Sequence, residues 1–165
     1  MKILGIAGYS GAGKTTLVSK LLAAFVARGL AVSVVKQSHH NVEVDQPGKD
    51  SWRHRQAGAH EVLLTSPYRW MLVGELRGAP EPDLDTLLTR LGPCDLVLVE
   101  GFRHAHLPKL EVWRNANGQP WLHPADPQII AVASDTRPPG ALPHFDLDDS
   151  ATIATFILDT LDIPC

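Results

Sequence analysis

Residues 8–15 read GYSGAGKT, so a lysine and a threonine directly follow a glycine-rich turn. The spacing from Gly8 to Thr15 matches the pattern G-x-x-x-x-G-K-T. Glycines let the backbone wrap closely around an anion, with consecutive N–H groups pointing at phosphate oxygens. Lys14 has the charge and reach for the terminal phosphates, and the Thr15 hydroxyl suits the accompanying magnesium ion. We therefore expect this loop to hold a nucleoside triphosphate.

The segments on either side of the loop support this expectation. Residues 2–7 form an apolar run typical of a buried strand. From about residue 13 to residue 28, Leu17, Leu21 and Phe25 recur at helical spacing. A helix that begins at the loop presents its positive N-terminal end to the bound anion. The motif alone does not decide between a kinase, a GTPase and a carrier.

A second acidic position follows the most apolar segment of the chain, in CDLVLVEGF. Residues 96–99 are expected to form a buried strand that ends at Glu100. P-loop proteins need a carboxylate near the magnesium ion, usually at the end of a neighbouring strand. We expect Glu100 to contact the metal or its waters, or to polarise an attacking water. Gly101 then leaves room for a ligand to approach.

A polar stretch, KQSHHNVEVDQPGKDS, follows the strand expected over residues 31–36. It begins at the carboxyl edge of the sheet, where α/β proteins bind ligands. Asp45 and Asp50 are candidates for outer ligands of the magnesium ion, although Asp50 is equally suited to capping a helix. His39 and His40 are candidates for donors to phosphate or to a second anionic ligand.

Apolar runs alternate with helical patterns along the chain, which predicts an α/β fold of three layers. Helices flank a mostly parallel central sheet, and two segments are expected to pair as an antiparallel hairpin. We expect all 165 residues to form a single domain. The further strands are expected over residues 61–65, 70–75, 110–113 and 129–133, and helices from residue 50 or 51 to about 58, from 82 to 91, and from about 150 onward.

The composition of the chain argues against several classes of function. A formal net charge of −3 provides no broad basic face for nucleic acid. No apolar run approaches the length of a membrane span, and glycines interrupt the N-terminus before a signal-peptide core forms. Two cysteines are too few for a disulfide framework. These features predict a cytoplasmic protein that binds neither membranes nor nucleic acids.

Several motifs together resemble one family. The stretches GYSGAGKTTL, KQSHH, DQPGKDSWRHRQAGA, DLVLVEGFRHAHLPKLEVWR and AVASD occur here in the order found in molybdopterin-guanine dinucleotide biosynthesis adapter proteins, the MobB family. The resemblance covers roughly residues 1–158. The D-x-P-G-K-D-S stretch and the V-E-G-F-basic stretch are its most specific parts.

The resemblance implies a GTP-binding P-loop protein that uses Mg²⁺ and has weak GTPase activity. Family members form homodimers and act with the molybdenum cofactor guanylyltransferase, which joins GMP to molybdopterin. Carried over by motif, Lys14 and Glu100 would be catalytic, with Gly101 beside the metal. Asp135 would accept hydrogen bonds from a guanine edge, although it is also a natural turn residue. The residues that would hold phosphates and magnesium are Gly11, Ala12, Gly13, Lys14, Thr15 and Thr16.

Three alternatives remain open on the sequence. The first is a small-molecule kinase that uses ATP, and the second is a nucleotide-gated metallochaperone GTPase. The third is an adapter in which GTP only sets a conformation and turnover is not required.

Overall fold

The computed structural model describes residues 1–38 and 40–164. The chain divides into two compact units. We call Met1–Gln37 together with Leu84–Cys165 the sheet unit, and Ser38–Asp83 the hairpin unit. The expectation that the whole chain is one domain stays a prediction.

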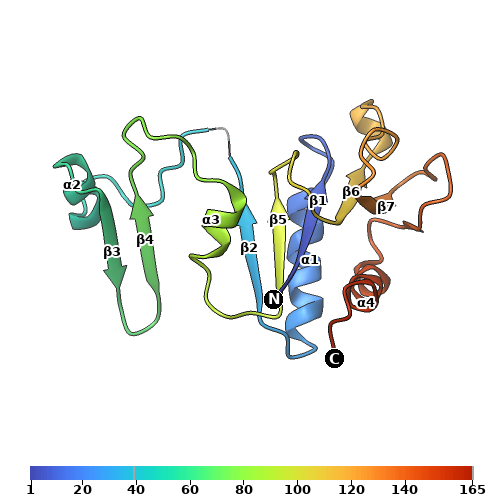
Figure 1. Ribbon diagram of the computed structural model, residues 1–165, viewed down its shortest axis with the longest axis horizontal. Coiled ribbons are helices and arrows are strands. Elements are labelled where there is room, and N and C mark those ends of the chain that lie inside the picture. Colours follow the sequence, from blue (N-terminus) through green and yellow to red (C-terminus); the bar gives the residue numbers. More distant parts are fainter. Residues whose placement is uncertain (39, 165) are drawn as a thin grey trace. The chain divides into compact units, whose positions relative to one another are not determined.

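The sheet unit contains a six-stranded sheet in the order β2-β5-β1-β6-β7-β8, and Figure 1 labels all of these strands except β8. Every pairing between neighbouring strands of this sheet is parallel. The carboxyl ends of parallel strands meet at one edge, so the segments that follow these strands are brought together. The strands are β1 (Lys2–Ala7), β2 (Val32–Lys36), β5 (Leu96–Glu100), β6 (Lys109–Trp113), β7 (Ile129–Ser134) and β8 (His144–Phe145).

Helices cover both faces of this sheet. Leu96 and Leu98 of β5 belong to the main core with α1 (Lys14–Val26) and α4 (Ser150–Thr160). The alternate residues Val97 and Val99 pack with α3 (Leu84–Leu88) in a second cluster. Successive side chains of a strand point to opposite faces, so this division shows a sheet between two helical layers. The predicted three-layer α/β fold is confirmed.

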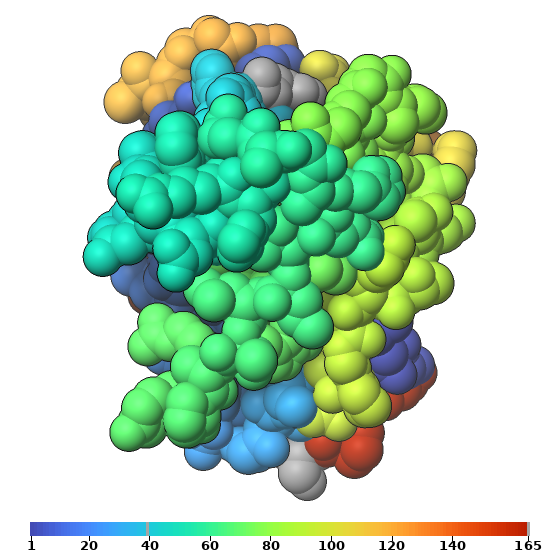
Figure 2. Space-filling view, turned by 90° about the vertical axis from the view of Figure 1, so that its left-hand side faces the viewer, coloured from blue at the N-terminus to red at the C-terminus, as the bar shows by residue number. Residues whose placement is uncertain are grey.

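The hairpin unit contains α2 (Asp50–Gln56) and a two-stranded antiparallel sheet of β3 (Glu61–Thr65) and β4 (Trp70–Gly74). Figure 2 shows the surface of α2 and this hairpin, in teal to green. Several large apolar side chains of the hairpin are exposed. Soluble proteins rarely expose such side chains in a group, and a two-stranded sheet is only marginally stable by itself. The most exposed are Leu63, Leu64, Tyr68 and Trp70.

The observed elements differ most from the sequence predictions at α3 and at β8. The helix expected over residues 82–91 is α-helical only over Leu84–Leu88. Beyond it, Arg90 and Leu91 donate backbone bonds to residues three positions back, which tightens the turn. The short strand β8 was not expected, because two residues carry no readable periodicity.

The connection between β6 and β7 is fastened to the sheet by a buried carboxylate. Glu111 of β6 is fully buried and accepts hydrogen bonds from the backbone N–H groups of Leu122 and His123, at 2.7 and 3.0 Å. The ring of His123 adds a contact of 2.8 Å through Nδ1. Trp113 stacks on Trp121, with ring centroids 3.9 Å apart. The long loop expected over residues 115–127 is therefore packed against β6.

We expect Glu111→Gln to lower the free energy of unfolding by about 2 kcal/mol, because an amide NH₂ would face N–H donors and leave at least one unpaired. Asp159→Asn, on the exposed side of α4, is the control and should change stability little. Urea unfolding followed by circular dichroism measures both. Equal stability of the two variants would contradict this account of the loop.

Candidate functional site

The glycine-rich loop connects β1, which ends at Ala7, to α1, which begins at Lys14. Gly8 has a φ of +146°, and a Cβ added there would lie 2.3 Å from the carbonyl oxygen of Val112. Only glycine allows this approach of the loop to β6. The neighbouring strand therefore fixes where the loop leaves the sheet.

The ammonium of Lys14 lies over the loop. It donates hydrogen bonds to the carbonyl oxygens of Gly8 and Tyr9, at 2.8 and 2.9 Å. Burial lowers the pKa of Lys14; the nearby Glu100 carboxylate opposes this effect, and the Lys36 ammonium adds to it. Lys14 and Glu100, the two residues predicted to be catalytic, are thus electrostatically coupled.

Thr15 and Glu100 meet at the start of α1. The Thr15 hydroxyl lies 3.4 and 3.5 Å from the two carboxylate oxygens of Glu100, which is 9% exposed. These are the hard oxygen donors that magnesium prefers. The donor set fits the ion. Among the described residues, no group of three or more His, Cys, Asp or Glu side chains forms a metal site.

Gly101 lies directly after Glu100 with a φ of +100°. A Cβ there would lie 2.6 Å from Cβ of Gln37, so the glycine permits the close approach of the segments that follow β5 and β2. The side-chain oxygen of Gln37 accepts a hydrogen bond from the N–H of Phe102, at 2.8 Å. This contact holds the backbone around Glu100.

Two residues at the loop were missed by the sequence analysis. A Cβ at Gly13 would lie 3.3 Å from Nε of Arg114, so this guanidinium lies against the residue that precedes α1. The side chain of Asn117 donates a hydrogen bond to the carbonyl oxygen of Ser10, at 3.1 Å. The sequence shows only that Arg114 follows an expected strand. Its position beside Gly13 depends on the pairing of β1 with β6, which cannot be read from the sequence.

Asp135 follows β7 and is exposed. Its Oδ1 accepts a hydrogen bond from the backbone N–H of Asn115, at 2.9 Å, which ties the end of β7 to the end of β6. The predicted guanine contact through Asp135 stays a prediction. The remaining loop residues Gly11, Ala12 and Thr16 lie where their motif requires, in the loop or the first turn of α1.

The other predicted residues belong to the hairpin unit. His39 lies outside the described residues, and His40 is exposed. Asp50 is the first residue of α2, and Lys49 is the N-cap, without a side-chain capping bond. The expected capping role of Asp50 is therefore not observed, and its role as a metal ligand stays a prediction.

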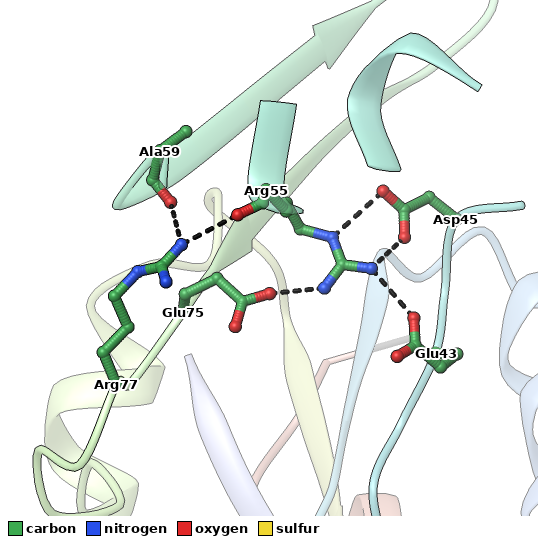
Figure 3. A network of polar contacts seen from close by, with 6 residues as sticks. All are labelled: Glu43, Asp45, Arg55, Ala59, Glu75 and Arg77. Carbon is green, nitrogen blue, oxygen red and sulfur yellow. Dashed lines mark hydrogen bonds and ion pairs between the residues drawn. The ribbon is translucent and has the colours of Figure 1, made fainter. Parts of the chain in front are cut away.

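Asp45 is buried within the hairpin unit, where it is engaged by Arg55 (Figure 3). Nε of Arg55 donates to Asp45 Oδ2 at 3.0 Å, and Nη2 contacts Asp45 Oδ1. The same guanidinium pairs with Glu43, at 2.8 Å, and with Glu75. Arg77 donates to the carbonyl oxygen of Arg55, at 2.9 Å. Asp45 thus has a structural partner within its own unit, and its predicted role toward magnesium stays a prediction.

The fold and the loop define the class of protein. A parallel sheet between helices, with a phosphate-binding motif between its first strand and first helix, is the architecture of P-loop proteins. The family model for molybdopterin guanine dinucleotide synthesis protein B matches residues 3–135. The chain belongs to this family, MobB.

Individual relatives agree with this assignment. The chain is 39% identical to the molybdopterin-guanine dinucleotide biosynthesis adapter protein of Escherichia coli K12, over 95% of this chain and 91% of that protein. It is 45% identical to the adapter protein of the same description from Haemophilus influenzae, over 81% and 74%.

Solved structures give the same result. A crystal structure of molybdopterin-guanine biosynthesis protein B has a TM-score of 0.77 and 33% identity, and covers 96% of this chain and 99% of that one. The crystal structure of a MobB homologue from Bacillus stearothermophilus has a TM-score of 0.73 and 25% identity, with 99% and 100% covered. No helix within residues 1–38 and 40–164 combines the length and hydropathy of a membrane span.

Gly8→Ala should destabilise the sheet unit by about 2 kcal/mol and disrupt the loop, since its methyl group would collide with the Val112 carbonyl at an unfavourable φ. Gly92→Ala is a matched control, because nothing lies within 4 Å of the added Cβ. Thermal unfolding measures the difference. If Gly8→Ala is as stable as Gly92→Ala, the close approach does not constrain the loop.

The hairpin unit should lose stability in acid. The hydrogen bond from Arg55 lowers the pKa of Asp45, and burial opposes this effect only partly. A carboxylate whose pKa is lowered by folding contributes stability above its unfolded pKa, and loses that contribution as pH falls through the folded pKa. Hydrogen exchange of peptides covering β3 and β4 measures this loss, as protection factors corrected for the intrinsic effect of pH.

Arg55→Gln should reduce protection in the hairpin near neutral pH and flatten its acid dependence, because the pairing with Asp45 is gone. Arg53→Gln, an exposed change in the same helix, is the control and should keep the acid dependence of the unchanged protein. An unaltered acid profile in Arg55→Gln would show that the network in Figure 3 does not carry this dependence.

Proposed function

We propose that this protein is a GTP-binding adapter with weak GTPase activity that assists the attachment of GMP to molybdopterin, giving molybdopterin guanine dinucleotide. The observation that carries the proposal is the meeting of Lys14, Thr15 and Glu100 at the carboxyl edge of the sheet, in a chain of the MobB family. The partners are GTP, the molybdopterin cofactor and the molybdenum cofactor guanylyltransferase.

The loop and the start of α1 bind the phosphates. Backbone N–H groups of residues 11–16 and the positive end of the helix supply the anion site. Lys14 exchanges its bonds to the loop carbonyls for bonds to the terminal phosphates, which are stronger acceptors. The guanidinium of Arg114, beside Gly13, adds positive charge at the same point. All these features favour a polyphosphate over a neutral ligand.

Thr15 and Glu100 orient the metal end of the nucleotide. Magnesium, when bound, neutralises charge that develops on the phosphates during hydrolysis. The Thr15 hydroxyl supplies one oxygen ligand, and Glu100 accepts hydrogen bonds from water near the terminal phosphate. Hydrolysis is expected to be slow, because P-loop GTPases depend on a well-placed additional cation for fast turnover. Weak turnover suits a role in which the bound state matters more than the rate.

The base is expected to lie at the ends of β6 and β7. Asp135 Oδ1 holds the Asn115 N–H, and Oδ2 has no hydrogen bond among the described residues. A carboxylate at this point is complementary to the two neighbouring N–H donors of a guanine edge, whereas adenine presents an acceptor there. This difference is the proposed source of preference for GTP over ATP.

The hairpin unit is the proposed surface for homodimer formation. Leu63, Leu64 and Trp70 are between 51% and 64% exposed, and large apolar side chains gathered on one hairpin are typical of contact surfaces. A two-stranded sheet also gains stability when a second copy extends or covers it. A dimer would present two nucleotide sites to the partner enzyme.

Nucleotide titration with GTP and ATP in the presence of magnesium tests the proposed function. Lys14→Ala should weaken GTP binding by roughly a hundredfold, because it removes a charge-assisted bond to phosphate. Asp135→Asn keeps an oxygen for the Asn115 N–H but presents an amide to the base, and should remove the preference for GTP. Asp159→Asn is the surface control. ATP binding as tight as GTP binding in the unchanged protein would favour a kinase instead.

A further inference from the structure

Lys36 is the last residue of β2, and its ammonium lies at the point where Thr15 and Glu100 meet. Its Nζ donates to the Thr15 hydroxyl at 3.3 Å and lies 3.4 Å from Glu100 Oε1. The parallel pairing of β2 with β5 sets Lys36 directly beside Glu100. Three polar groups from β2, β5 and α1 therefore converge within 3.5 Å of one another.

The same two oxygen-bearing side chains form the donor set proposed for magnesium. A divalent ion would be held by the Thr15 hydroxyl, with the Glu100 carboxylate on the ion or on its waters. The ammonium of Lys36 is a cation at this same position. Two cations this close repel each other, so the metal and the ammonium exclude one another at Glu100.

The Lys36 side chain lies partly in solvent. Its side chain is 53% exposed, whereas that of Glu100 is 11% exposed. The long stem of a lysine changes rotamer readily when its charged end is near solvent. Leaving Glu100 therefore costs little packing, and the carboxylate stays in place for the next cation.

We propose that the Lys36 ammonium is the counter-ion of Glu100 before magnesium binds, and that the metal displaces it from Glu100 on binding. This inference rests on the proposed function. Before metal binding, the ammonium offsets the repulsion between the Glu100 carboxylate and an incoming nucleotide phosphate. After the exchange, it is released close to the phosphates as a second lysine beside Lys14.

The influence of Lys36 on Lys14 supports this arrangement. Burial is the main cause that lowers the pKa of Lys14; Glu100 raises it, and the Lys36 ammonium makes the smallest contribution, which lowers it. The three charges therefore belong to one local cluster. No contact with the hairpin unit is needed for this role.

Manganese binding followed by electron paramagnetic resonance tests the inference on the full chain without nucleotide. Lys36→Met should bind Mn²⁺ about fivefold more tightly than the unchanged protein, because the competing cation is removed. Lys2→Met makes the same change of charge at the start of β1, where Lys2 is exposed, and should alter Mn²⁺ affinity by less than about twofold. Adding Glu100→Gln to Lys36→Met should remove the gain.

Binding of a fluorescent GTP analogue in excess EDTA gives a second readout. Lys36→Met should bind the analogue more weakly than the unchanged protein without metal, and Lys36→Arg should keep most of that binding because it keeps the charge. An Mn²⁺ affinity in Lys36→Met equal to or weaker than that of the unchanged protein would overturn the inference. A gain that persists with Glu100→Gln would overturn it as well.

These experiments distinguish a failure of the inference about Lys36 from a failure of the proposed function. If the unchanged protein binds no GTP but Lys36→Met still gains Mn²⁺ affinity through Glu100, the proposed function fails and the inference about Lys36 stands. If GTP binds as proposed and Mn²⁺ affinity does not change, the inference fails alone.

Discussion

The parallel pairing of β5 with β1 on one side and β2 on the other is the constraint on which the site depends. It sets Glu100 beside Ile6 in one register and beside Lys36 in the other. Because all three strands run in the same direction, their ends meet where the phosphate loop begins. A shift of register in either pairing would separate Glu100 from Thr15, although every local motif would remain intact.

A second pairing, between β1 and β6, shapes the other side of the loop. It brings the Val112 carbonyl against Gly8 and carries Arg114 to Gly13. The loop is therefore held between two neighbouring strands, with acidic and metal-related groups on the β5 side and a guanidinium on the β6 side. This asymmetry suits the proposed ligand, an extended nucleotide whose phosphates would bind the metal and whose base would lie toward β7.

The sequence predicts well what is local. The phosphate loop, β1 and the hairpin strands follow from motif spacing and hydrophobic periodicity, and their bounds in the structure agree closely. Contacts between distant segments are not readable in this way. The positions of Lys36 and Arg114 depend on strand order and on side-chain rotamers, and the pairing of Asp45 with Arg55 depends on how α2 folds back. The residue type alone predicts a metal ligand at Asp45, whereas in the structure this carboxylate pairs with the guanidinium of Arg55.

We propose that one magnesium-nucleotide site forms where the loop, Thr15 and Glu100 meet. A crystal structure of the protein with Mg²⁺ and a non-hydrolysable GTP analogue tests it most directly. We expect the phosphates along residues 11–16, the metal bound by the Thr15 hydroxyl with Glu100 on the metal or its waters, and the guanine at the end of β7. A nucleotide bound elsewhere, or a metal that contacts neither Thr15 nor the surroundings of Glu100, would contradict it.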